Sequence, residues 1–157
     1  MKPILLGVPP HRSDPTDGLH VWLMDPPGVL DCASAAHMSG GMVQWLTGPA
    51  TEDLPHIFGK STQLAFVHDW RRVRSYDLSA RARLVAWGLQ MGPRVVKSIL
   101  ILLSPESPAM VRMACHAGVV PFAMAGIKVS VDESGDYALA TLGARPHPPP
   151  TTPPTGA

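Results

Sequence analysis

The sequence predicts a single α/β domain in which helices pack against a mixed β-sheet. Segments with the periodicity of strands alternate with segments that have the periodicity of helices, an order typical of sheets whose strands are joined by helices. The chain has 157 residues, which is the usual size of one domain. Hydrophobic residues make up 45% of it and charged residues 16%, so there is ample apolar material for one core. We expect about three to four helices on the sheet, within a domain that spans residues 1–143.

The N-terminal segments are predicted to be strands separated by proline-rich loops. Residues 4–8 form a short apolar run and are a candidate first strand, whereas residues 9–17 combine prolines with polar side chains and are typical of an exposed loop. Residues 19–24 are predicted to form a strand that ends at the turn 25–28, because the two prolines there have no N–H to donate to a sheet.

The next segment is interpreted as a helix, a loop and a strand. Asp31 is predicted to cap a helix that extends to about Thr47, where a Gly-Pro pair would end it. Residues 50–61 are expected to be a loop, and residues 62–68 are the next apolar strand candidate. The residues expected on the buried face of the helix are Ala35, Met38, Met42, Trp45 and Leu46.

The middle of the chain contains the most regular helical pattern. Asp77 is placed as the N-cap, and Gly92 with Pro93 provides the stop. Residues 95–103 are rich in β-branched residues and Leu, which favours a central strand covered on both faces. The apolar positions that define the helix are Leu78, Ala82, Val85 and Leu89.

The last predicted elements are a helix and two strands. Ser107 is expected to cap the helix, with Pro108 at its first position. Residues 127–132 alternate like a strand, residues 133–136 have the composition of a tight turn, and residues 137–142 would return as an antiparallel edge strand. The expected apolar stripe of the helix consists of Val111, Ala114, Cys115, Gly118, Val119 and Phe122.

Composition excludes several classes of protein. Thirteen Lys and Arg against twelve Asp and Glu give a net charge of +1, which lacks the basic excess typical of nucleic-acid binding. No apolar run approaches the roughly 20 residues that a membrane span needs, and there is no signal peptide, so we expect a cytoplasmic protein. Cys32 and Cys115 are interpreted as buried thiols. Eighteen prolines are unusual, and their density over residues 144–157 predicts a disordered tail.

The sequence contains none of the common metal-binding, phosphate-binding or catalytic motifs. The seven histidines have no metal-binding spacing, and neither phosphate-binding glycine loops nor Gly-x-Ser-x-Gly are present. His68 and Asp69 are consecutive strand residues, so their side chains would face opposite sides of the sheet. Cys115 belongs to an apolar stripe, which favours a core position. We therefore expect no metal, no cofactor and no catalytic residue, and an enzyme using Cys115 or His68 stays a minor alternative.

The polar stretch at residues 68–83 is the candidate functional surface. Five of the thirteen basic residues lie within residues 71–83, and Arg with aromatic side chains is the composition of interface hot spots. The other reading is a solvated loop and helix face. A phosphate near Ser79 would be stabilised by the free N–H groups at the helix start. The residues expected to bind a partner are Asp69, Trp70, Arg71, Arg72, Arg74, Ser75, Tyr76, Asp77 and Arg81.

The segment from Asp69 to Ala80, together with the element order, resembles the STAS fold of SpoIIAA-like anti-sigma-factor antagonists. In that family a strand Asp is followed at this distance by Asp-Ser-Ser-Gly, whose second Ser is the phosphoacceptor. The resemblance puts Ser79 in the phosphoacceptor position and Asp77 in the acidic position before it. Leu78 replaces the first Ser and Ala80 replaces the Gly, so half of the motif is retained, as in a divergent member.

The resemblance implies a non-enzymatic regulatory or scaffold module that binds a protein partner. The implied partner is a kinase-like anti-sigma factor or a scaffold protein in bacterial-type signalling, and the domain itself is a candidate for homo-oligomer formation. The implied switch is phosphorylation at the start of the second helix, at Ser79. The alternative is a small-molecule or lipid-binding module of the same fold, since this architecture can enclose an apolar ligand between sheet and helices.

Overall fold

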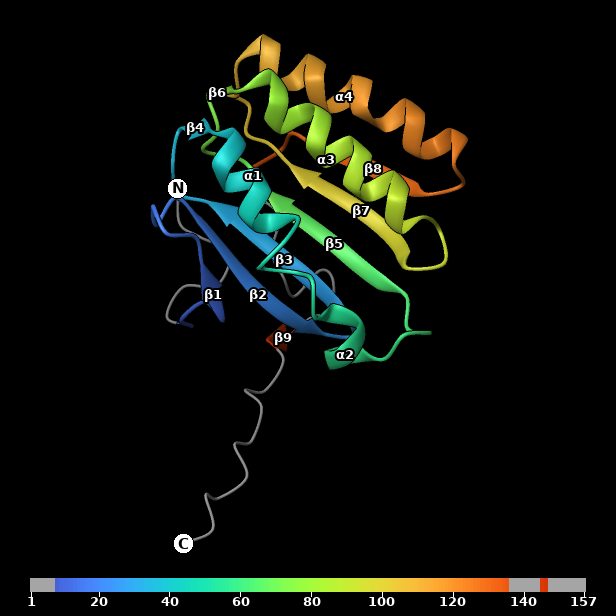
Figure 1. Cartoon of the computed structure of the whole chain (residues 1–157). Helices are drawn as coiled ribbons and strands as arrows, with labels where there is room; N and C mark the ends of the chain where they lie inside the picture. The colour runs from blue at the N-terminus through green and yellow to red at the C-terminus, as the bar shows by residue number, and fades with distance from the viewer. Residues whose placement is uncertain (1–7, 136–144, 147–157) are drawn as a thin grey trace, which may run out of the picture.

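The computed structural model describes residues 8–135 and 145–146, and within them the α/β class is confirmed. A mixed sheet carries α1, α3 and α4 on one face (Figure 1). The strands are β1 (Arg12–Ser13), β2 (Leu19–Asp25), β3 (Gly28–Ala33), β4 (His37–Met38), β5 (Leu64–Asp69), β6 (Ser75–Tyr76), β7 (Val96–Leu102), β8 (Lys128–Asp132) and β9 (Arg145–Pro146). The helices are α1 (Gly40–Leu46), α2 (Leu54–Phe58), α3 (Leu78–Met91) and α4 (Ala109–Met124).

The sheet combines an antiparallel hairpin with parallel crossovers. Its order is β1-β2-β3-β5-β7-β8, with β9 also paired to β2. The strands β2 and β3 form the hairpin around the predicted turn 25–28, and β3, β5, β7 and β8 run parallel to one another. The predicted strand at 95–103 is confirmed as β7, which lies between β5 and β8. Parallel strands put their carboxyl ends at one edge of the sheet, where α/β proteins commonly bind ligands.

The predicted helix cap at Asp31 is wrong. Asp31 lies inside β3, in which every residue is buried. Helix α1 begins only at Gly40, and its N-cap is Ser39, whose hydroxyl accepts a hydrogen bond from the Met42 N–H at 3.2 Å. A lone carboxylate in an apolar run has the pattern of a cap, but in the fold its oxygens find donors on the neighbouring strand. The run can therefore remain a buried strand.

Two short elements lie in segments predicted to be loops. Residues 12–13 form β1, and residues 54–58 form α2. Arg12 connects them, because its guanidinium donates to both carboxylate oxygens of Asp53 at 2.7 and 2.8 Å. This ion pair holds the pKa of Asp53 below its ordinary value. A contact between residues so distant in sequence is invisible to a local pattern.

Helix α3 is confirmed, with Asp77 as N-cap and Gly92 as C-cap, but its buried face is not the predicted one. Leu78 is 77% exposed, whereas the small residues Ala80 and Gly88 are buried. This helix has apolar residues on several of its faces, so the helical spacing of apolar residues alone does not show which face is buried. The face that packs is the one on which small residues permit close approach.

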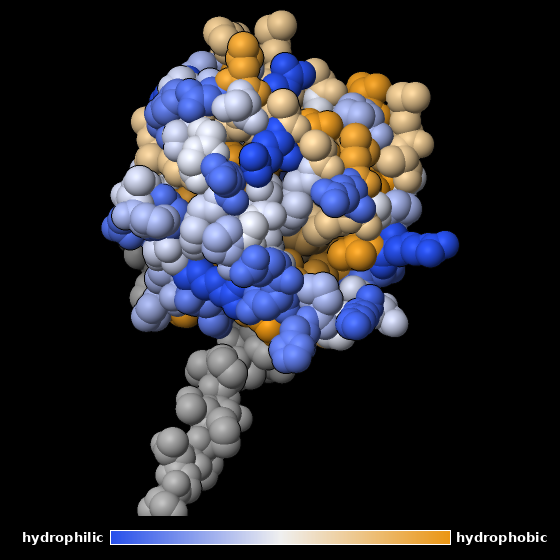
Figure 2. All heavy atoms as spheres, viewed as in Figure 1, coloured by the Kyte–Doolittle hydropathy of each residue, from blue (hydrophilic) through white to orange (hydrophobic). Residues whose placement is uncertain are grey.

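Helix α4 follows its predicted stripe, since Val111, Cys115 and Phe122 are buried. Its predicted cap is wrong. The N-cap is Pro108, and the Ser107 hydroxyl accepts a hydrogen bond from the Ser104 N–H at 3.0 Å. The exposed apolar side chains of this helix gather at the top of the molecule (Figure 2).

The core occupies both faces of the sheet. The larger cluster lies between the sheet and the helices, and a smaller cluster lies on the opposite face. Among the described residues, no helix combines the length and apolar composition needed to cross a membrane. The candidate strands at 4–8 (except Val8) and 137–142, and the predicted tail at 144–157 apart from β9, lie outside the described residues.

Candidate functional site

Two pairs of polar residues are buried side by side where β3 and β5 end. The parallel register sets Asp31 opposite His68 and Cys32 opposite Asp69. Because successive strand residues point to opposite faces, the first pair faces the helices and the second faces the smaller cluster, to which Cys32 belongs. His68 and Asp69 therefore do point apart, as the sequence predicts, and the partner of His68 comes from the neighbouring strand.

Asp31 fixes the orientation of two aromatic rings. Its carboxylate accepts hydrogen bonds from His68 Nδ1 and, at 3.0 Å, from Trp70 Nε1. The imidazole and the indole stack with centroids 4.8 Å apart and planes inclined by 28°. The Asp31 side chain is 1% exposed and that of His68 is 6% exposed. A histidine held in this way presents its second nitrogen in a defined direction.

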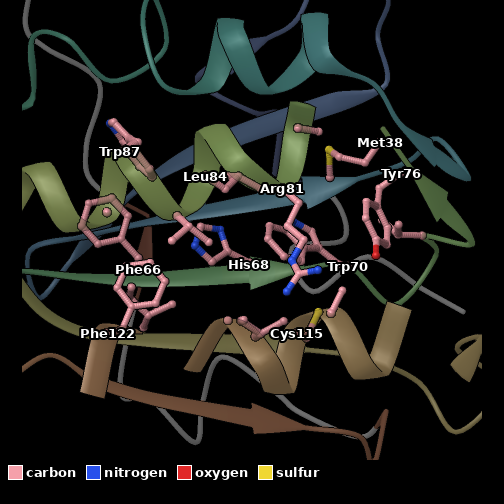
Figure 3. A pocket seen from close by; sticks show the side chains of 18 of the residues that line it. Met38, Phe66, His68, Trp70, Tyr76, Arg81, Leu84, Trp87, Cys115 and Phe122 are labelled. Atoms are coloured by element: carbon pink, nitrogen blue, oxygen red, sulfur yellow. The ribbon is translucent and has the colours of Figure 1, made fainter. Parts of the chain in front are cut away.

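That second nitrogen, Nε2 of His68, faces a cavity. Nε2 has no hydrogen-bond partner among the described residues. Every fully buried side-chain nitrogen or oxygen in the described residues does have a partner, so Nε2 is not fully buried. It must therefore be accessible, and His68 lines a cavity of about 100 Å³ between the sheet, α3 and α4 (Figure 3). The cavity walls are apolar and aromatic, with Phe66, Trp70, Tyr76, Trp87, Met91 and Phe122 among them.

On the opposite face, Asp69 and Arg71 form a closed ion pair. Arg71 donates from Nε and from its terminal nitrogen to the two Asp69 oxygens at 2.7 and 2.8 Å, and also to the Gly135 carbonyl at 3.1 Å. The hydrogen bonds to Asp69 raise the pKa of Arg71. Both residues are buried. This corrects the expectation that Asp69 and Arg71 belong to an exposed binding surface.

The start of α3 is tied to the start of α1. The Asp77 carboxylate accepts a hydrogen bond from the Gly40 N–H at 2.9 Å and contacts His37 Nε2 at 3.0 Å. His37 Nδ1 lies 2.7 Å from Ser75 Oγ. The Gly40 N–H and then His37 hold the pKa of Asp77 below its ordinary value. Asp77 and Ser75 thus join β4, β6 and α1.

The remaining predicted site residues divide into two groups. Trp70 and Tyr76 are half-buried and line the cavity. Arg72, Arg74 and Ser79 are exposed, and Arg81 is exposed while also lining the cavity. In the folded domain, the arginines and Ser79 of the predicted surface are thus exposed, whereas its two aromatic residues face the cavity.

The two thiols are poorly suited to nucleophilic chemistry. Burial raises the pKa of Cys32 to about 12, helped by the Asp69 carboxylate, and burial raises the pKa of Cys115 to about 12. Both are protonated at neutral pH, and it is the thiolate that attacks. Within residues 8–135, no group of three or more His, Cys, Asp or Glu side chains is arranged to hold a metal ion.

Sequence reasoning missed Asp31 and His37. Asp31 was assigned to a helix, so its pairing with His68 could not be considered. The available signal was one acidic residue inside the apolar run 28–33 and one histidine at the end of the apolar run 62–68. Two buried strands that each carry one polar residue at the same end are candidates for such a pair. His37 carries no comparable signal.

No protein-family model matches the chain, and comparisons with curated proteins and with solved structures found no match.

Proposed function

We propose that the chain is a STAS-like protein-interaction module without catalytic activity of its own. A hairpin followed by parallel crossovers agrees with the element order on which the STAS resemblance rests. The proposed contact surface, called here the helix-start surface, consists of Arg72, Arg74, Leu78 and Ser79. The proposed partner is a regulatory kinase-like protein or a scaffold protein.

The exposure of Leu78 is the observation that carries this proposal. Leu78 is the first residue of α3 and is 77% exposed. The helix already orders the backbone of Leu78, so a partner that covers the residue has only its side chain to immobilise. Arg72 and Arg74 are exposed a few residues before it. An apolar anchor beside arginines is the composition of an interface hot spot.

The charge of this surface indicates an acidic partner. Arg72 and Arg74 supply two permanent positive charges, and an Arg guanidinium binds carboxylates through two parallel hydrogen bonds. The neighbouring Asp77 is already bonded to Gly40 and His37. The partner surface that fits is therefore an apolar pocket bordered by Asp or Glu.

Ser79 supplies the proposed switch. It is exposed in the first turn of α3, and its Oγ would lie 2.8 Å from a Cβ added at Gly40. Phosphorylation would bring close to two negative charges next to Leu78 and five residues after Arg74 along the chain. These charges repel an acidic partner, so we expect the phosphorylated chain to release it.

The test is capture of partners from the native cells with tagged variants, read by mass spectrometry. Arg74→Glu and Leu78→Asp are expected to lose the proteins that the wild type enriches, by at least tenfold. Arg94→Glu is the matched control, because Arg94 is exposed just beyond the far end of α3. Equal capture by Arg74→Glu and Arg94→Glu would contradict the proposed surface. For the switch, Ser79→Glu should lower capture, and a phosphopeptide map should contain phosphorylated Ser79.

A further inference from the structure

The cavity beneath α3 has the walls of a ligand site. It is bounded by the sheet residues Phe66 and His68 and by residues of α3 and α4 (Figure 3). Phe66 and Trp87 meet edge to face, with centroids 5.5 Å apart. Small-molecule sites are typically apolar cavities with a few convergent polar groups. This one has aromatic walls and one inward-facing imidazole nitrogen.

The nitrogen of His68 is a polar group without a partner inside an apolar space. Its side chain is 94% buried, since 6% of its surface is exposed, and Asp31 and Trp70 hold the ring in place. A polar atom that opens into an apolar cavity is normally bonded to water or to a ligand. In its neutral form Nε2 accepts a hydrogen bond, and in the protonated ring it donates one. A carboxylate can only accept hydrogen bonds, so it is bound by the ring with both nitrogens protonated, in which Nδ1 donates to Asp31 and Nε2 donates to the ligand.

The charge of the lining favours an anion. Of the lining residues in the described part of the chain, Arg81 alone is exposed, so it stands at the opening. Its guanidinium has no ion pair or hydrogen bond to the described part of the chain. Among the described residues, no Asp or Glu lines the cavity. One unpaired positive charge at the opening of an apolar space complements a negatively charged group on an apolar body.

The size of the cavity favours a ligand with one ring. A volume of about 100 Å³ is of the order of the roughly 150 Å³ that accommodates one benzene molecule. We therefore expect a ligand with a single ring to bind more tightly than one with a long acyl chain. We propose that the cavity between the sheet, α3 and α4 binds a small aromatic carboxylate, with its ring among Phe66, Trp87 and Phe122 and its carboxyl group bonded to Arg81 and His68.

Titration with sodium benzoate, followed by two-dimensional ¹H–¹⁵N NMR of the full chain, tests the proposal. The four tryptophans report position: Trp70 and Trp87 line the cavity, whereas Trp22 belongs to the cluster on the opposite face and Trp45 lies on α1. We expect saturable shifts of the Trp70 and Trp87 indole signals, with Trp22 and Trp45 unchanged. Benzamide has the same shape without the charge, and it should bind at least tenfold more weakly.

Two variants separate the roles of the polar groups. Arg81→Gln is expected to raise the dissociation constant of benzoate about tenfold. Arg83→Gln removes the same charge two residues away and outside the lining, and should change it less than twofold. His68→Asn keeps a donor near the position of Nδ1 for Asp31 but removes Nε2, and it should also weaken binding about tenfold. Urea denaturation of each variant verifies that it is folded.

Several results would overturn the proposal. Shifts confined to Trp22 or Trp45, or no saturable shift, exclude the cavity as the site. Equal affinities for benzoate and benzamide, or equal effects of Arg81→Gln and Arg83→Gln, exclude recognition of the charge. Tighter binding of decanoate than of benzoate excludes the size limit. None of these results bears on the helix-start surface, whose test uses Arg74 and Leu78.

Discussion

The polar side chains at the ends of β3 and β5 have different hydrogen-bond partners on the two faces of the sheet. On the face opposite the helices, Asp69 and Arg71 share two short hydrogen bonds, and Arg71 also reaches the Gly135 carbonyl. On the face toward the helices, Asp31 has donors for both oxygens, while His68 keeps one nitrogen for the cavity. Neighbouring residues in sequence thus have opposite roles.

This difference separates structural polar groups from binding groups. A buried ion pair whose hydrogen bonds are all satisfied has nothing to offer a ligand, and its loss affects folding. A buried ring with one bonded and one open nitrogen is held in place and still able to bind. Perturbing each face in turn should therefore give two distinct results, one in stability and one in ligand binding.

The largest effect on stability is expected from Arg71→Ala. Asp69 is 3% exposed, and leaving a buried carboxylate without its partner typically costs about 3–5 kcal/mol. His68→Asn retains a donor for Asp31 and should cost about 1 kcal/mol or less. Urea denaturation monitored by circular dichroism measures both free energies of unfolding.

The double variant Asp69→Ala with Arg71→Ala sharpens this test. It leaves no unpaired charge, so its cost should be smaller than the sum of the two single variants. If Arg71→Ala costs no more than His68→Asn, or if the single costs add, the ion pair does not have the structural role described above.

A smaller effect is expected where α3 and α4 approach each other beside the cavity. A Cβ added at Gly88 would lie 2.4 Å from a ring carbon of Phe122. Because Phe122 lines the cavity, Gly88→Ala must displace its ring or separate the helices, at a cost of about 1–3 kcal/mol. The Phe122 ring is then expected to fill part of the cavity and to weaken benzoate binding.

Gly118→Ala is the matched control for this prediction. Gly118 also lines the cavity, but a Cβ there meets nothing within 4 Å. Replacing a glycine inside a helix by alanine then stabilises the protein by about 0.5–1 kcal/mol. The same direction of change in both variants would show that the approach of α3 and α4 is not tight at Gly88.

The sequence predicted the elements better than the site. Period and stop signals suffice for β2, β7, β8, α3 and α4, because each has a local pattern with Gly or Pro close to at least one end, and apolar composition alone suffices for β5. The error at Asp31 was also local: a carboxylate before a helical pattern resembles a cap, and only the pairing of β3 with β5 shows that it binds His68. Likewise, the arginines at 71–83 look equivalent in sequence, yet Arg71 is buried and Arg74 is exposed.

The smallest expected difference between the two faces of the sheet concerns the two thiols, since one lies on each face. Cys32 lies on the face opposite the helices and Cys115 lines the cavity, and burial raises the pKa of each to about 12. At pH 8 about one molecule in ten thousand carries a given thiolate, whereas an ordinary thiol with a pKa of about 8.5 is roughly one quarter ionised. Alkylation by iodoacetamide should therefore be at least a thousandfold slower than in urea, as measured by mass spectrometry.

The same pKa values set the dependence of the free energy of unfolding on pH. A thiol whose pKa is raised by folding stabilises the folded state fully below its unfolded pKa, so the free energy of unfolding should fall as pH rises from about 9 towards 12. This decline should be shallower in Cys32→Ala and in Cys115→Ala.

Methyl methanethiosulfonate is small and apolar enough to enter the cavity, so it should label Cys115 before Cys32, and benzoate should slow that reaction. Labelling of Cys32 first would mean that the face opposite the helices is more accessible to the reagent than the cavity is.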